Sequence, residues 1–140
     1  MSFNDVYYTA SLVEYIGRLT QNKRSDVVAC IGESGLRHLL RAASVNHCLS
    51  FEQVSDEVIE EYNIPTGSFD TVSSCRYKVP SHLSIGKVYA RLVEDVGGED
   101  SAATLFGILS SPFSEALSDF NSSLYFAPRG ELVYHYLNAG

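Results

Sequence analysis

The chain has 140 residues, the length of one ordinary domain, and 45% of them are hydrophobic, enough for a core without disulfides or a structural metal. Its 17 acidic and 10 basic residues give a formal net charge of −7, which disfavours non-specific binding to nucleic acids or membranes and permits a basic partner. No run of about 18 apolar residues occurs, which argues against a transmembrane helix.

Cysteine use and the N-terminus point to a reducing compartment. The three cysteines, Cys30, Cys48 and Cys75, are odd in number and widely spaced, and no Cys-x-x-Cys pair occurs. Residues 1–8 carry neither a basic segment nor an apolar one, so no signal peptide is expected. We therefore expect a cytoplasmic protein.

Three short helices are predicted before residue 50. The first is capped by Asn4 or Asp5 and continues with apolar residues at helical spacing. The second follows Ser25 and ends at Gly32, because glycine readily takes the left-handed conformation that closes a helix. The third begins at Ser34, directly after this turn.

The two helices around this turn could form a helix-turn-helix, whose second helix would present Arg37 and Arg41 to nucleic acid. Half of the ten basic residues lie between positions 18 and 41. Against this hypothesis, the first helix is only about two turns long, and the net charge of the chain repels phosphate. A small nucleic-acid-binding regulator is therefore the second hypothesis for function.

A fourth helix, over residues 51–62, is predicted from its caps and its two faces. Ser50 and Gln53 have the spacing of a capping box, and Asn63 is a residue type that closes helices. Carboxylates crowd the polar face, and those near the C-terminal end oppose the helix dipole. Such a face is usually only solvated, but it also suits a basic partner surface. The residues assigned to partner binding here are Glu57, Glu60 and Glu61.

Residues 64–80 change character. Prolines and glycine interrupt helices there, and several β-branched and aromatic residues favour extended structure. We predict an ordered loop with irregular or short β structure. Within it, Phe69 is expected to anchor the loop in the core, and Asp70 is expected to cap a turn.

The second half contains the strongest helix signal. A helix beginning at Ser81 or Ser84 keeps apolar residues on one face from Ile85 onward and ends at Gly97. Three shorter segments follow, with starts at Asp100 or Ser101, at Ser111-Pro112 and at Pro128. The predicted fold is mainly α, a compact bundle of about six to eight short helices. It forms a single domain over 1–140, with subdomains 1–63 and 81–140 joined by the ordered loop 64–80.

Several stretches of this chain resemble an uncharacterised family of small bacterial proteins. They are Val13–Arg18 with the segment up to Leu36, residues 51–64, Gly67–Asp70 with the segment up to Tyr89, and Phe120–Tyr125. The resemblance implies a small helical domain of unknown function, of the kind found in gut bacteria and mobile elements. It implies no catalytic residues.

No catalytic, cofactor or metal motif stands out. A zinc site needs four ligands, usually in close pairs, and the adjacent His47 and Cys48 would chelate poorly. The Gly-x-Ser-x-Gly elbow and the phosphate-binding loop are both absent. We therefore expect no cofactor and no metal. One enzymatic alternative remains, a site that the fold would assemble from Asp70, Cys75 and His82.

The C-terminal end is rich in aromatic residues. Seven of the sixteen aromatics lie in the last 35 positions, and tyrosine is enriched at protein interfaces. Tyr134 and Tyr136 cannot both face inward on one helix. We predict a non-enzymatic protein-binding module, such as an inhibitor, an antitoxin or an accessory protein of a mobile element, which binds another protein or itself. The aromatic residues assigned to its contact surface are Tyr125, Phe126 and Tyr134.

Overall fold

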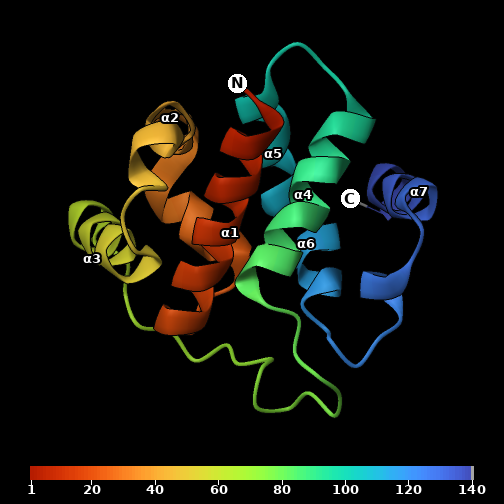
Figure 1. Cartoon of the computed structure of the whole chain (residues 1–140). Helices are drawn as coiled ribbons and strands as arrows, with labels where there is room; N and C mark the ends of the chain where they lie inside the picture. The colour runs from red at the N-terminus through yellow and green to blue at the C-terminus, as the bar shows by residue number, and fades with distance from the viewer. Residues whose placement is uncertain (140) are drawn as a thin grey trace.

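The computed structural model describes residues 1–139 and shows a bundle of α-helices (Figure 1). Its elements are α1 (Phe3–Thr20), α2 (Arg24–Asn46), α3 (Phe51–Tyr62), α4 (His82–Val96), α5 (Ser101–Leu109), α6 (Pro112–Leu117), the 3-10 helix η1 (Leu124–Phe126) and α7 (Arg129–Ala139). α1 lies at the centre between α2 and α4, and α3 and α7 lie on opposite sides. The predicted helical class is confirmed. The short β segment predicted within 64–80 is wrong, because none of the described residues forms a strand.

One cluster of buried side chains runs through the bundle. It includes residues from both segments predicted as subdomains, with Leu12 of α1 and Leu36 of α2 beside Ile85 of α4 and Leu105 of α5. The most extensive helix packing joins α1 to α4, across the two segments. No helix within residues 1–139 is both long and apolar enough to cross a membrane.

A glycine allows α1 and α4 to approach closely. A Cβ atom built on Gly86 would collide with the Ser11 hydroxyl and would lie 2.8 Å from the Ser11 backbone nitrogen. Backbone cannot yield as a flexible side chain can, so this position of α4 requires a residue without a side chain. The hydroxyl of Ser11 donates to the carbonyl of Tyr7 at 2.8 Å, so the polar group in this dry contact is satisfied.

Most of the predicted helix ends are confirmed. Ser50, Ser81 and Asp100 each accept a hydrogen bond from the first turn of the helix that follows. Asn63 closes α3 in the left-handed conformation, with φ 51° and ψ 49°, and α4 ends at Gly97. The first cap differs from the prediction. Ser2 rather than Asn4 or Asp5 caps α1, and the carboxylate of Asp5 completes a capping box by accepting from the Ser2 backbone N–H.

The helix break predicted at Gly32 is confirmed, although it is a kink at a single residue and not a longer turn. Gly32 has φ 76° and ψ 162°, a conformation that only glycine adopts readily, and helix continues directly on both sides of it. The range of α2 thus holds two helices joined at Gly32, and the second begins directly after this residue, close to the predicted start at Ser34. A helix-turn-helix usually has a turn of about three or four residues, and the segment Arg24–Asn46 lacks one.

The loop 64–80 is held by hydrogen bonds to the end of α1. The backbone N–H of Gly67 donates to the Thr20 carbonyl at 2.8 Å, and that of Phe69 donates to the Gln21 carbonyl at 2.9 Å. A Cβ atom on Gly67 would collide with the Gln21 carbonyl, so the close approach depends on glycine. The loop is ordered as predicted, but its backbone pairs with a helix end instead of another extended segment.

Phe69 does not anchor this loop in the core. Its ring is half-buried at the surface, where the ammonium of Lys23 lies 5.7 Å from the ring centroid. The prediction for Asp70 is confirmed, because its carboxylate accepts from the backbone N–H groups of Val72 and Ser73 at 3.0 and 3.1 Å. A hydrogen bond from the Ser73 hydroxyl, together with these two backbone bonds, lowers the pKa of Asp70 below its usual value.

The glycine contact between α1 and α4 gives a first prediction. Gly86→Ala should destabilise the fold by about 1–3 kcal/mol, because the added methyl group overpacks a backbone contact. Gly107→Ala is the matched control inside α5, where a Cβ atom would meet the Tyr136 hydroxyl at an ordinary 3.7 Å. That change should be neutral or stabilising by up to about 1 kcal/mol. Urea unfolding measures both, and equal effects would contradict the close approach.

Candidate functional site

The C-terminal part of the chain exposes large apolar side chains. Phe126 is 74% exposed, Tyr134 is 68% exposed and Leu137 is 64% exposed. Tyr134 and Leu137 are three residues apart and therefore lie on the same side of α7, while Leu132 faces the bundle. Phe126 lies in η1, just before α7. We refer to Phe126, Tyr134 and Leu137 as the C-terminal apolar surface.

The other aromatic residues of this segment face inward. Tyr136 packs edge-on against Phe113 of α6, with 6.2 Å between ring centroids, and so fixes which side of α7 meets the bundle. Tyr125 is half-buried and meets the Phe126 ring edge-on at 5.0 Å. Of the three aromatics predicted for partner binding, Phe126 and Tyr134 are therefore open to solvent, and Tyr125 is not fully so.

α3 turns its carboxylates to solvent. Val54 and Val58 face the core, and the acidic side chains on the rest of the helix are exposed. Within the described chain none of them takes part in an ion pair. The exposed acidic residues of α3 are Glu52, Asp56, Glu57, Glu60 and Glu61.

Of the two basic residues predicted to contact nucleic acid, one is engaged in an ion pair and one is not. Arg37 makes a two-point contact with Asp100, the cap of α5, at 2.8 and 3.0 Å. Arg41 is exposed and, over residues 1–139, takes part in no ion pair. The other cations of this region also take part in ion pairs: Arg18 and Arg24 share the carboxylate of Glu14, and Lys23 pairs with Glu115.

Asp70, Cys75 and His82 do not come together as a site. The carboxylate of Asp70 is occupied by Ser73, and the Cys75 thiol lies 3.2 Å from a backbone carbonyl two residues along the chain. The imidazole of His82 packs edge-on against Phe51 at 4.7 Å, and burial lowers its pKa. No hydrogen bond in the described part joins any two of the three. That part also holds no cluster of three His, Cys, Asp or Glu side chains suited to a metal ion.

Sequence reasoning missed a buried ion pair next to the loop 64–80. Glu14 and Arg24 are only 5% and 3% exposed, and the Arg24 Nε donates to Glu14 Oε1 at 2.6 Å. Nη1 of Arg24 donates to the Ser114 carbonyl at 2.8 Å and to the Ser118 hydroxyl at 2.7 Å. The guanidinium lies 5.2 Å from the centre of the Tyr89 ring.

The neighbours of this pair complete its hydrogen bonds. Arg18 donates to the second carboxylate oxygen of Glu14 at 2.7 Å, and the Tyr89 hydroxyl lies 2.9 Å from that of Ser114. Burial acts to lower the pKa of Arg24, but Tyr89 and Glu14 raise it overall, so the guanidinium stays charged. A pocket of about 290 Å³ opens beside the pair, but the charged groups at its base are already satisfied by protein partners. We interpret this network as structural.

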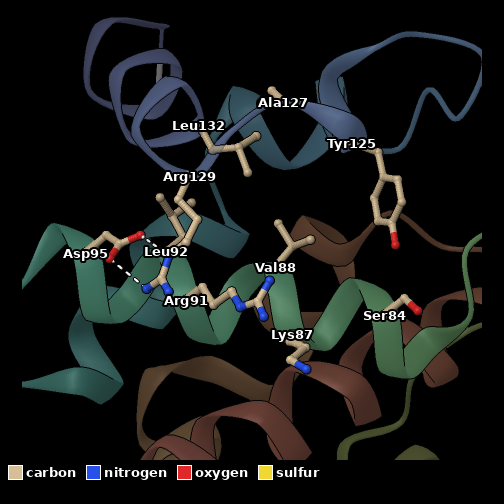
Figure 2. Close-up of a pocket in the computed structure, with 10 residues that line it drawn as sticks. All are labelled: Ser84, Lys87, Val88, Arg91, Leu92, Asp95, Tyr125, Ala127, Arg129 and Leu132. Atoms are coloured by element: carbon tan, nitrogen blue, oxygen red, sulfur yellow. Dashed lines mark hydrogen bonds and ion pairs between the residues drawn. The ribbon is translucent and has the colours of Figure 1, made fainter.

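A second cleft lies between α4 and the segment formed by η1 and α7 (Figure 2). Its volume is about 220 Å³, and its floor contains the apolar side chains Val88, Leu92 and Leu132. Arg129 bridges the two walls by donating to Asp95 of α4 at 2.8 and 2.9 Å. The cleft therefore combines apolar and charged groups on one concave surface.

Comparison with protein-family models, with curated proteins and with solved structures gave no match. The relationship to a family of small helical bacterial proteins stays a prediction.

The buried ion pair gives a second prediction. Arg24→Met should destabilise the fold by about 3–5 kcal/mol, because it leaves Glu14 buried without its main partner. Lys23→Met is the control, since it removes a solvent-exposed pair with Glu115 and should have a much smaller effect. Urea unfolding compares the two variants, and similar midpoints would show that the buried pair contributes no more to stability than the exposed one. The double variant Glu14→Leu/Arg24→Met should be more stable than Arg24→Met alone.

The Arg37–Asp100 pair gives a third prediction, about pH. Arg37 and the backbone N–H of Ala103 lower the pKa of Asp100 from 3.8 to about 2. Because the pKa is lower in the folded state, this stabilisation is present above about pH 4 and is lost as the pH falls through about 2. Asp100→Asn keeps a capping residue but loses the ion pair. The difference in melting temperature between wild type and this variant should shrink between about pH 6 and about pH 2, and a constant difference would contradict the assignment.

Proposed function

We propose that this chain is a non-enzymatic protein-binding module and that its partner contacts the C-terminal apolar surface. The observation that carries the proposal is that this surface provides three of the five most exposed large apolar side chains of the described chain. Tyr134 and Leu137 lie on one side of α7, and monomeric proteins seldom leave neighbouring large apolar side chains in contact with water. Aromatic residues are also enriched at the centres of interfaces.

The proposed partner is a different protein with a basic surface. The net charge of −7 attracts a basic protein and speeds its association, and the carboxylates of α3 add to this charge from the side of the bundle opposite α7. A second copy of this chain would carry the same negative charge and would be repelled. An inhibitor, an antitoxin or an accessory protein of a mobile element fits this description, and the exposed thiols of Cys30 and Cys48 suit a reducing cytoplasm.

The fourth prediction tests the surface directly. Tagged wild-type protein should capture a basic partner from a lysate of the source organism, and the partner, identified by mass spectrometry and then purified, should bind again in isolation. Tyr134→Ser/Leu137→Ser should weaken that binding by at least about 2 kcal/mol, or about thirtyfold, because it removes apolar contacts from the centre of the interface. Isothermal titration calorimetry on the purified pair measures the loss.

Tyr77→Ser is the matched control, because Tyr77 is 67% exposed in the loop 64–80, away from α7. It should leave partner binding unchanged, and both variants should melt like wild type. The proposal fails if the α7 variant binds as well as wild type. It also fails if light scattering shows a wild-type dimer that Tyr134→Ser/Leu137→Ser converts to a monomer, since the surface would then be covered by a second copy.

A further inference from the structure

The cleft between α4 and α7 has unpaired cations in an otherwise acidic protein. Its lining carries three cationic side chains, Lys87, Arg91 and Arg129, and one carboxylate, Asp95. Within residues 1–139, neither Lys87 nor Arg91 takes part in an ion pair. The local excess of positive charge is opposite in sign to the net charge of −7. An anion is therefore attracted to this cleft more than to the surrounding surface.

The reason why Arg91 lacks a partner is visible in the geometry. Asp95 lies four residues after Arg91 on α4, a spacing at which the two would ordinarily pair. Arg129 takes this carboxylate instead, with contacts at 2.8 and 2.9 Å, and also reaches Glu94 at 3.1 Å. Because Arg129 of α7 binds the Asp95 carboxylate, Arg91 is left without this partner (Figure 2).

Lys87 and Arg91 are themselves four residues apart on the same face of α4. Like charges at this spacing repel and destabilise a helix unless an anion lies between them. Both side chains extend from the α4 side of the cleft, and the guanidinium of Arg91 lies beside Val88 (Figure 2). Because both residues line the same cleft, an anionic group bound there would reduce their repulsion.

The remaining walls suit an apolar body next to that anionic group. Leu92 and Leu132 are buried at the floor and Val88 is half-buried beside them. The hydroxyl of Tyr125 points toward the turn of α4 that carries Ser84 (Figure 2). Ser84 accepts a hydrogen bond from Ser81 at 3.0 Å and keeps its own proton free to donate. A ring or short chain on the floor would thus have charged and neutral donors around it.

We propose that this cleft binds a small organic phosphate monoester, with the phosphate held between Lys87 and Arg91 and an apolar or aromatic body lying on Val88, Leu92 and Leu132. A phosphate dianion matches two cations, and Arg binds phosphate oxygens through its planar pair of donors. The cleft volume of about 220 Å³ is sufficient for a single ring. This site is separate from the C-terminal apolar surface, since Tyr134 and Leu137 do not line it.

The fifth prediction uses phenyl phosphate as the probe, with isothermal titration calorimetry at low salt. Phenyl phosphate should bind at one site, and inorganic phosphate and phenol should each bind at least about tenfold more weakly, because the first lacks the apolar body and the second lacks the charge. Lys87→Gln/Arg91→Gln should weaken phenyl phosphate binding by at least about tenfold. Amide shifts in ¹⁵N spectra on titration should centre on Val88, Arg91 and Leu132.

Arg76→Gln/Lys78→Gln is the matched control, because it also removes two exposed cations but lies in the loop 64–80. It should change phenyl phosphate binding by less than about twofold, whereas a general charge effect would weaken both variants alike. The proposal is overturned if phenyl phosphate does not saturate a site, if inorganic phosphate or phenol binds equally well, or if the two double variants behave the same. These results leave the test of the protein partner unaffected, because that test uses other residues.

Discussion

The Glu14–Arg24 ion pair constrains how the helices of this bundle are arranged. Burying two opposite charges is tolerated only when both keep a complete set of hydrogen-bond partners. The guanidinium of Arg24 therefore needs acceptors for its remaining N–H groups. Those acceptors are the Ser114 carbonyl and the Ser118 hydroxyl of the α6 region, and Tyr89 of α4 covers the face of the guanidinium. α1, α2, α4 and α6 therefore share one buried network. Because α6 also carries the ring against which α7 packs, the network also helps to place the cleft between α4 and α7.

Local signals were enough to predict much of the fold. A cap or a closing glycine acts within a few residues of its helix end, so Ser50, Ser81 and Gly97 could be recognised from their neighbours alone. The hydrogen-bond partners of the loop 64–80 could not be predicted in this way, because its backbone pairs with Thr20 and Gln21, more than forty positions earlier. The buried Glu14 was equally hidden, since an acidic residue on an amphipathic helix is ordinarily expected on the solvent face.

The site could be predicted only in part for the same reason. Helical spacing correctly separated Tyr134 from the inward-facing Tyr136, because the two belong to one helix. In contrast, Arg91 followed by Asp95 has the sequence pattern of a solvated ion pair. Only the position of Arg129, 34 residues beyond Asp95, shows that the carboxylate is engaged elsewhere. An ion pair between two segments that are distant in the chain has no local sequence pattern, so it could not be predicted.

The packing of α1 on α4 has a consequence for how the chain is made. α1 ends at Thr20, but the helix that covers it begins only at His82. At synthesis rates of about 5–20 residues per second, several seconds pass between the synthesis of α1 and that of α4, which covers its apolar face. During that time α2 and α3 are its only native neighbours among the helices already made. The packing of α1 can therefore be completed only after α4 has been made.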